Sequence, residues 1–175
     1  MKYLKFLVSF FGRDIPIHLI NLFTALLPNH IVTNRIRGGL IGLFLGSCGK
    51  RLQIGKGVII NNPGSIFIGN DCYISHYCYV QGKGRIEFGD NVIIGPMSVI
   101  ASSNHLIKDG KVLNKGISAP ISIGHGTWCG GHVVIVSGVT IGKSSIVAAG
   151  AVVTKDIVAG GKVAGIPAKM IQPRI

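Results

Sequence analysis

Acidic residues are scarce in this chain of 175 residues: six Asp and Glu stand against 18 Lys and Arg, which gives a formal net charge of +12. Such an excess of positive charge favours an anionic partner, for example a nucleic acid, an anionic lipid surface or a phosphorylated ligand. The basic residues do not alternate with aromatic residues in a stripe, and no zinc-finger spacing occurs. Binding of nucleic acid is therefore not expected.

Three further absences narrow the class of protein. The four cysteines form no CxxC pair, which argues against a disulfide framework or a metal requirement and fits a reducing compartment such as the cytoplasm. No apolar run approaches the roughly 18 residues of a membrane span. Only 14% of the residues are charged while 47% are hydrophobic, so the composition is not that of a disordered chain. We therefore expect one folded cytoplasmic domain.

What the sequence does contain is a six-residue repeat of apolar residues. Of its 16 positions, 14 are Ile or Val, where composition alone gives about four. The repeat positions are Ile54, Ile60, Ile66, Ile68, Ile74, Val80, Ile86, Phe88, Ile94, Ile100, Ile123, Cys129, Ile135, Ile141, Val147 and Val153.

A period of six matches neither the helical period of 3.6 nor the strand period of 2. It fits a short flat strand followed by a tight turn, and three such units close a triangular coil that stacks on its neighbours. Glycine often follows a repeat position, as at Gly95 and Gly142, and we expect it to supply positive-φ turns. The sequence therefore predicts a mainly β solenoid over residues 51–158.

The flank before the repeat, residues 1–50, contains three apolar stretches that are typical of helices. We expect Asp14 to cap the second helix, and Thr33 or Asn34 to cap the third. Residues 1–60 hold eight Lys and Arg against one acid. This flank is expected either to cap the open end of the solenoid or to make peripheral contact with an anionic membrane.

The repeat is interrupted after Ile100, and a polar insertion follows at residues 106–120. We expect this insertion to be a flexible, protruding loop. His105 stands at its base, and functional residues in solenoids gather where loops leave the scaffold. A neutral imidazole can accept a proton at neutral pH, so His105 is a candidate general base. The alternative is a solvated loop residue. Residues 159–175 leave the repeat as a C-terminal tail.

Three segments resemble one known family: "SSNHLI", "ISIGHGTWCGGHVVIVSGVTIGKSSIVAAGAVVTKDI" and "AGIPAKMI" are similar to the acetyl-CoA-dependent acetyltransferases of the hexapeptide-repeat family, notably the sugar and polysaccharide O-acetyltransferases. The resemblance implies a left-handed parallel β-helix, although the crossover rule alone predicts a right-handed one. It also implies acetyl-CoA as co-substrate, direct attack by the acceptor without an acyl-enzyme, and a homotrimer with the site between neighbouring chains.

The resemblance further implies roles for individual residues. His105 would act as the general base, and the backbone N–H near Gly131 would stabilise the oxyanion. Trp128 would lie at the acceptor side of the site, beside the cofactor, and its alternative role is packing at a coil corner. Arg174 could also contact the CoA phosphates. The alternative for these cationic side chains is that they are simply solvated. The residues expected to bind the cofactor are Trp128, Gly130, Gly131, Ala149, Thr154, Lys155 and Lys169.

Two departures from the family bear on the acceptor. Ser75 stands where some small-sugar acetyltransferases carry an asparagine, and the insertion contains no glutamate. Together with the long apolar flank, these departures favour a surface polysaccharide of a bacterium, or its lipid-linked precursor, over a small soluble sugar. We therefore expect an O-acetyltransferase. The alternatives are an N-acetyltransferase of an amino-sugar nucleotide or xenobiotic, a metal enzyme resembling γ-class carbonic anhydrases, and an inactive scaffold.

Overall fold

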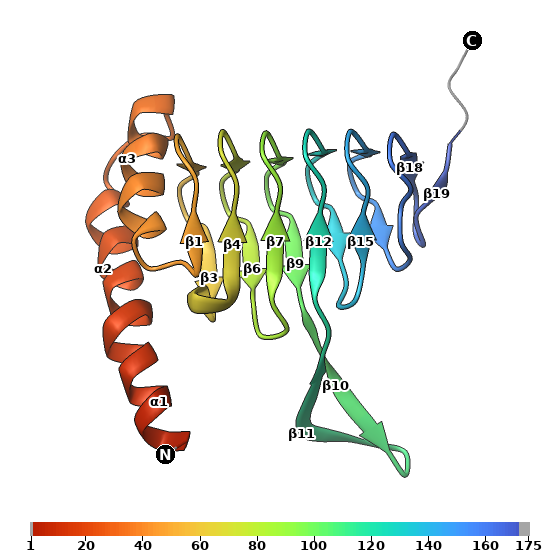
Figure 1. Ribbon diagram of the computed structural model, residues 1–175, viewed down its shortest axis with the longest axis horizontal. Coiled ribbons are helices and arrows are strands. Elements are labelled where there is room, and N and C mark those ends of the chain that lie inside the picture. Colours follow the sequence, from red (N-terminus) through yellow and green to blue (C-terminus); the bar gives the residue numbers. More distant parts are fainter. Residues whose placement is uncertain (1, 172–175) are drawn as a thin grey trace.

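A computed structural model describes residues 2–171, whose short strands wind into a triangular solenoid of about six turns (Figure 1). Helices cover one end of the solenoid, and a two-stranded hairpin projects from its side. The predicted mainly β solenoid, with a helical cap and a projecting segment, is thereby confirmed.

Three sheets of five, seven and five strands form the faces of the solenoid. The first sheet contains β1 (Ser47–Cys48), β4 (Ile66–Ile68), β7 (Ile86–Phe88), β12 (Ile121–Ile123) and β15 (Thr140–Ile141). The second contains β2 (Gln53–Ile54), β5 (Tyr73–Ile74), β8 (Ile93–Ile94), β13 (Trp128–Cys129), β16 (Ile146–Val147), β18 (Lys162–Ala164) and β19 (Lys169–Met170). The third contains β3 (Ile59–Asn61), β6 (Tyr79–Gln81), β9 (Val99–Ala101), β14 (Val134–Ile135) and β17 (Val152–Val153).

Neighbouring strands within each sheet run parallel, except that β19 pairs antiparallel with β18. The strands extend past the predicted 51–158 range at both ends. Cys48 lies six residues before Ile54 and belongs to β1, which pairs with β4. Val163, on β18, pairs with Val147. Both residues continue the apolar pattern of the solenoid beyond the range in which the repeat was recognised.

The repeat positions form the core of the solenoid. All of them point inward, and none is more than 7% exposed. In the third sheet, Ile135 stacks between Ile100 and Val153, so that each inward side chain contacts the coil above and the coil below. Burial of such a side chain stabilises the fold by about 1.5–3 kcal/mol.

Glycine follows the repeat positions for a reason other than the one predicted. Gly95 and Gly142 do not adopt positive φ; a Cβ on Gly95 would lie 2.4 Å from the carbonyl carbon of Gly130, and one on Gly142 would lie 2.3 Å from the nitrogen of Ala159. Close approach of the next coil therefore requires glycine there. Positive φ occurs instead three places after the repeat position, often in residues with side chains: Asp71, Tyr77, Asn91, Met97, His132 and Ser144.

The first two expected helices are joined into one. Helix α1 (Lys2–Ser9) continues through a π-helical turn, η1 (Phe10–Asp14), into α2 (Ile15–Thr24). The prediction that Asp14 is an N-cap is therefore wrong, because its φ and ψ of −70° and −45° are helical and its side chain makes no capping bond. The π turn precedes Pro16, whose ring disturbs the preceding turn of a regular α-helix.

Helix α3 (Ile31–Gly42) begins one turn before the predicted caps. His30 is the N-cap: its Nδ1 accepts a hydrogen bond from the Val32 N–H, and Thr33 Oγ1 accepts one from the His30 N–H. Thr33 thus completes a capping box instead of being the cap itself. Asn34 lies inside the helix and is buried. A short 3₁₀ turn, η2 (Pro63–Ser65), precedes β4.

A buried arginine fastens the helical cap to the first coil. Arg37 is 1% exposed. Its guanidinium donates to the side chains of Thr24 and Asn34, at 3.0 and 2.9 Å, and to the carbonyl oxygen of Ile54 at 3.2 Å. One side chain therefore joins α2, α3 and β2. Within residues 2–171, none of the helices has both the length and the apolar character needed to span a bilayer.

Candidate active site

The insertion that interrupts the repeat is a β-hairpin and not the flexible loop that was predicted. Strands β10 (Ser103–Lys108) and β11 (Lys111–Ser118) pair antiparallel, with a register shift between His105 and Ile107. The two residues at the tip, Asp109 and Gly110, both have positive φ, as a type I′ turn requires. The Asp-Gly pair is a recognised hairpin signal and could have identified this structure from the sequence.

His105 lies at the base of the hairpin and is exposed. Its Nδ1 is 3.2 Å from the carbonyl oxygen of Leu113 on the facing strand. Because a carbonyl can only accept, this contact requires the proton of the neutral ring on Nδ1, and Nε2 has no hydrogen-bond partner among residues 2–171. The hairpin therefore holds the imidazole in the tautomer that a general base needs.

A hollow of about 200 Å³ opens beside His105. Its lining is polar, and Ser103 Oγ donates to Gln81 Oε1 at 2.8 Å within it. No side-chain carboxylate contributes to this lining. The residues that line the hollow are Gln81, Lys83, Ser103, Asn104, His105, Asn114 and Gly116.

A second hollow, of about 360 Å³ and lined by both polar and apolar side chains, lies one strand away, between α2 and β3. Asn61 lines it and is the register partner of Gln81, which lines the first hollow. Asn61 Nδ2 donates to the hydroxyl of Tyr79 at 2.9 Å. Asp14 also lines this hollow, and burial raises the pKa of its carboxyl, against a smaller opposite effect of Arg13. Hydrogen-bonding groups thus continue from His105 toward the helical cap.

The two glycines of "WCGG" differ in what they offer a ligand. The Gly130 N–H donates to the carbonyl oxygen of Val147 at 2.8 Å, and a Cβ on Gly130 would lie 2.7 Å from the nitrogen of Ala149, so this glycine serves coil packing. Gly131 is half-buried, and its N–H donates no hydrogen bond within residues 2–171. Of the two, Gly131 therefore has the amide available to an oxyanion.

The other candidate residues lie on the surface of the solenoid. Trp128 projects from β13 and is 53% exposed, so core packing does not explain it. Ala149 is exposed at the corner that stacks directly on Gly130 and Gly131. Thr154 and Lys155 are exposed just after β17, and Lys169 is exposed on β19. Arg174 lies outside the described residues.

Most of the candidate residues lie along two edges of the solenoid. We call the edge from the second to the third sheet the glycine corner; it comprises residues 75–78, 95–98, 130–133 and 148–151. The edge from the third to the first sheet is the hairpin corner; it comprises residues 81–85, 102–120, 136–139 and 154–156. Hydrogen bonds from coil to coil follow each corner, for example from the Gly150 N–H to Gly131 O, 2.9 Å.

Within one chain the two corners do not meet. Gly131 and Ala149 lie on the glycine corner, whereas His105, Thr154 and Lys155 lie on the hairpin corner. One strand of the third sheet separates them, a span of roughly 15 Å at about 3.3 Å per residue. A single chain therefore does not bring His105 to Gly131.

The contacts of Ser75 with polar neighbours on the glycine corner were not anticipated from the sequence. Ser75 is buried, and its hydroxyl donates to that of Tyr73 at 3.1 Å and lies 3.2 Å from His76 Nδ1. Asn29, from the turn between α2 and α3, places its Nδ2 3.2 Å from the same His76 nitrogen. Ser75 is thus part of a hydrogen-bonded cluster around His76. Only contact between the cap and the second coil assembles this cluster.

The side chains of His, Cys, Asp and Glu do not assemble a metal site in the described part of the chain: no group of three or more lies close enough to hold an ion.

Comparison with known proteins begins with sequence. None of the known protein-family models matches the chain. A galactoside O-acetyltransferase of Escherichia coli K12 is 33% identical over 141 residues, which make up 78% of this chain and 68% of the relative. Putative acetyltransferases of Saccharomyces cerevisiae and Schizosaccharomyces pombe, 35% and 36% identical, are matched over 66% and 53% of their own length. The chain thus spans between about half and two thirds of these curated relatives.

Solved structures share the whole architecture. A hexapeptide-repeat acetyltransferase of Vibrio cholerae, solved as a complex with acetyl-CoA, is 27% identical, with a TM-score of 0.78 over 91% of this chain and 85% of that one. A maltose O-acetyltransferase of Clostridium difficile is also 27% identical, with a TM-score of 0.80 over 94% of this chain and 87% of that one. Both similarities include the helical cap as well as the coils, because they cover more than nine tenths of the chain.

Proposed function

Because this chain belongs to the hexapeptide-repeat acetyltransferases, which use acetyl-CoA as co-substrate, we propose that it acetylates a sugar hydroxyl of a bacterial surface polysaccharide or of its lipid-linked precursor. The relatives named for galactoside and maltose support a sugar as acceptor. The polar hollow beside His105, and its continuation toward Asn61, support an acceptor rich in hydroxyl groups.

The free Nε2 of His105 is the observation that carries the proposal. With Nδ1–H held by the Leu113 carbonyl, Nε2 can take the proton of the acceptor hydroxyl as its oxygen attacks the thioester carbon. The Gly131 N–H would donate to the oxyanion of the tetrahedral intermediate. Collapse of the intermediate breaks the C–S bond, and the leaving thiolate of CoA receives the proton from His105.

We further propose that the enzyme is a homotrimer whose sites lie between chains. The separation of His105 from the glycine corner supports this, because a neighbouring chain would have to supply the second half of the site. Along the glycine corner, Ala149 would contact the pantetheine arm beside Trp128. Thr154, Lys155 and Lys169 would bind the rest of CoA. This arrangement would exclude water from the thioester at the chain interface.

The proposed location is the cytoplasm, at the inner face of the cell membrane. Acetyl-CoA as co-substrate supports the cytoplasm, and the basic, apolar N-terminal flank supports peripheral contact with anionic lipid.

An acetyl-transfer assay over a panel of acceptors tests the proposed activity. Release of the CoA thiol is measured with monosaccharides, amino sugars, oligosaccharides and lipid-linked glycans, and the product is identified by mass spectrometry. We expect O-acetylated oligosaccharide or lipid-linked glycan as the main product. Selective N-acetylation of the amino sugars would favour the N-acetyltransferase alternative, and no transfer to any acceptor, despite acetyl-CoA binding, would favour an inactive scaffold.

A further inference from the structure

The end of the solenoid that carries the helices is an apolar surface. Helix α3 packs on the first coil, where Arg37 reaches Ile54, and α2 packs on it through Asn21, whose Nδ2 donates to the Val58 carbonyl at 3.1 Å. The opposite sides of both helices therefore point away from the solenoid. Figure 1 shows the helices at one end of the solenoid, on the left, with the coils extending away from them to the right.

Each helix carries a stripe of exposed apolar side chains, and the stripes of α2 and α3 lie on the sides turned away from the first coil. Within the helices the spacing is i, i+3, i+4 on α1 and α2 and i, i+4, i+8 on α3, which keeps these members on one side of each helix, and the last member of each stripe lies one or two residues beyond the end of its helix. The stripes consist of Leu4, Leu7, Val8 and Phe11; Leu19, Leu22, Phe23 and Leu26; and Val32, Ile36, Leu40 and Leu43. We call these residues the apolar end face. Exposed apolar surface on this scale marks an interaction site.

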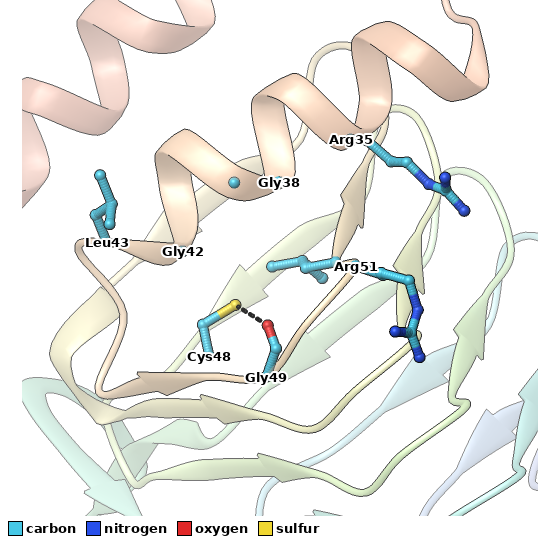
Figure 2. A pocket seen from close by; sticks show the side chains of 9 residues that line it. Arg35, Gly38, Gly42, Leu43, Cys48, Gly49 and Arg51 are labelled. Atoms are coloured by element: carbon cyan, nitrogen blue, oxygen red, sulfur yellow. Dashed lines mark hydrogen bonds between the residues drawn. The ribbon is translucent and has the colours of Figure 1, made fainter.

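A groove of about 330 Å³ runs along one margin of the apolar end face, between α3 and the first coil. Figure 2 shows it: Leu43 lies at one end, and the guanidinium groups of Arg35 and Arg51 extend together at the other. Gly39 lines the groove, and a Cβ there would meet nothing within 4 Å, so packing does not require this glycine. Glycine is a poorer helix former than alanine, and here its effect is to keep the groove open.

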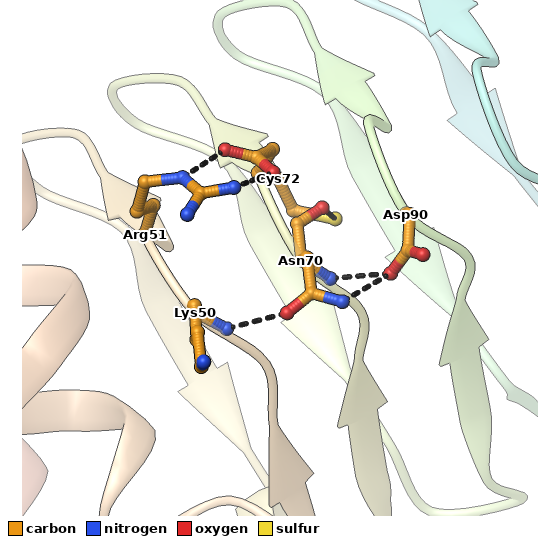
Figure 3. A network of polar contacts seen from close by, with 6 residues as sticks. Lys50, Arg51, Asn70, Cys72 and Asp90 are labelled. Atoms are coloured by element: carbon orange, nitrogen blue, oxygen red, sulfur yellow. Dashed lines mark hydrogen bonds and ion pairs between the residues drawn. The ribbon is translucent and has the colours of Figure 1, made fainter.

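The cationic end of the groove is held in place by a ladder of polar contacts (Figure 3). Arg51 makes two hydrogen bonds to the carboxylate of Asp71. Asn70 accepts from the Lys50 N–H at 2.9 Å and donates through its own backbone and side chain to Asp90, at 2.6 and 3.0 Å. The corner that carries Lys50 and Arg51 is therefore fixed before any ligand arrives.

The charge at this margin is positive. Arg35, Lys50 and Arg51 are exposed cations, and the acids among these contacts are Asp71 and Asp90, so the cations outnumber the acids. The hydrogen bonds of Arg51 lower the pKa of Asp71, and the charge of Arg35 lowers it further, so the carboxylate is ionised and the sum remains positive. Arg35 makes no hydrogen bond or ion pair with any described residue. Its guanidinium is available to an anion.

We propose that the apolar end face docks on an anionic lipid bilayer, with the phosphate of a lipid headgroup between Arg35 and Arg51 and the neighbouring part of that lipid in the groove toward Leu43. The inference rests on the proposed contact with the membrane and specifies its surface and its ligand. Helices that lie in the interface with apolar residues immersed and cations at the margin bind bilayers in this manner. A second copy of the chain is disfavoured as occupant, because a two-fold contact would bring the same cationic margins together.

Co-sedimentation of the full chain with vesicles tests the proposal. Vesicles of phosphatidylcholine alone are compared with vesicles that also contain phosphatidylglycerol, at low and high salt. We expect binding to the anionic vesicles that weakens with salt. Arg35→Gln is expected to weaken it about fivefold, since a cation near an anionic surface contributes about 1 kcal/mol. Phe23→Asp is expected to weaken it at least about tenfold by removing a large apolar side chain.

Gly39→Leu tests the groove itself. The Cβ of the new side chain meets no atom within 4 Å and the rest extends into the groove, so the variant is expected to fold and yet to lose the preference for phosphatidylglycerol. Matched controls are Lys143→Gln and Val158→Asp, which make the same changes at exposed positions of later coils and are expected to bind as the unmodified chain does.

Three results would overturn the proposal: no binding of the unmodified chain to anionic vesicles, equal loss of binding in the controls, or a dimer in light scattering that Phe23→Asp dissociates. The acetyl-transfer assay on the same preparations separates this question from the proposed activity. Transfer without vesicle binding rejects only the docking surface, and vesicle binding without transfer rejects only the enzyme reaction.

Discussion

The imidazole of His105 is oriented by a backbone carbonyl and not by a carboxylate. Its partner, the Leu113 oxygen, belongs to the facing strand of the same hairpin, at 3.2 Å. A carbonyl fixes the tautomer as a carboxylate would, but it adds no full negative charge to stabilise the imidazolium. The pairing of β10 with β11 therefore orients the imidazole of His105. Any change that shifts β11 along β10 should lower activity by disturbing that orientation.

Replacement of His105 by alanine is expected to lower kcat by about 10²- to 10⁴-fold, because a positioned base contributes about that much. Binding of acetyl-CoA and the oligomeric state should not change, since the residue is exposed and lies outside the core. Initial rates and acetyl-CoA affinity measure the two effects, and Lys108→Ala, on the same strand, is the control. If His105→Ala keeps most of the activity, the base lies elsewhere.

Because the thiol of Cys129 is buried at a repeat position, we expect the fold to lose stability at alkaline pH. Burial raises the pKa of its thiol to about 12. Thiols of the unfolded chain ionise near about 8.5, so above that pH the unfolded state binds fewer protons than the native state. The contribution to stability is complete below about pH 8.5 and is lost as pH rises toward about 12.

Cys129→Val keeps an apolar side chain of similar size and removes the ionisable group. We expect it to flatten the fall in the free energy of unfolding between about pH 7 and about pH 10, measured by urea titration. Cys48→Val, at a half-buried thiol, is the comparison and should change the slope less. An unchanged slope in Cys129→Val would contradict the assignment.

In the coils, glycine occurs where the backbone of the next coil lies too close for a side chain, and not where a turn needs a positive φ. Residues with side chains occupy the left-handed positions of many corners, as Met97 and His132 do. Gly95, by contrast, has neighbouring backbone 2.4 Å from where its Cβ would be. Gly39, in α3, has nothing near that position. Packing therefore requires glycine at such positions in the coils but does not require Gly39 in the helical cap.

Alanine substitutions at Gly95 and Gly39 form a matched pair. Gly95→Ala should destabilise the fold by about 1–3 kcal/mol, as overpacking of a tight contact does. Gly39→Ala should stabilise it by up to about 1 kcal/mol, through helix propensity alone. Thermal or urea unfolding of both variants measures the difference, and effects of the same sign would refute this account of the two glycines.

Some elements of the fold can be predicted from the sequence, and others cannot. The repeat positions Ile54 to Val153 identify the core because only residues that point inward must be apolar, and burial of this set follows from its period. The hairpin was missed because its strands carry no six-residue repeat, although Asp109 and Gly110 mark its turn. The joined helix was missed because a π turn leaves no simple pattern. The cluster around His76 and Asn29 depends on contact between distant segments, which no local pattern records.

At the scale of the molecule, the separation of the two corners determines what one chain can do. His105 stands on the hairpin corner, and Gly131 and Ala149 stand on the glycine corner, one strand of the third sheet away. In a closed ring of identical chains, the hairpin corner of each chain can face the glycine corner of the next. Every site would then draw His105 and the Gly131 amide from different chains.

Complementation between two inactive variants tests this sharing. His105→Ala removes the base, and Ala149→Trp blocks the glycine corner at an exposed position. Mixed oligomers, formed by co-expression, should regain part of the activity, because some sites receive His105 from one chain and the intact corner from another. If mixing restores nothing while light scattering shows mixed trimers, each site belongs to one chain. A monomer with full activity would reject the trimer altogether.

The coil from which the hairpin leaves the solenoid sets the distance between His105 and the helical end. The hairpin leaves the third coil, two coil steps of about 4.8 Å beyond the first, and the layer of helices adds about 10 Å. With the apolar end face on a bilayer, His105 stands about 20 Å above the headgroups. Sugars next to the lipid would pass beneath it, and only units farther along the glycan would reach the imidazole. The number of coils below the hairpin would then set which sugar of a growing chain is acetylated.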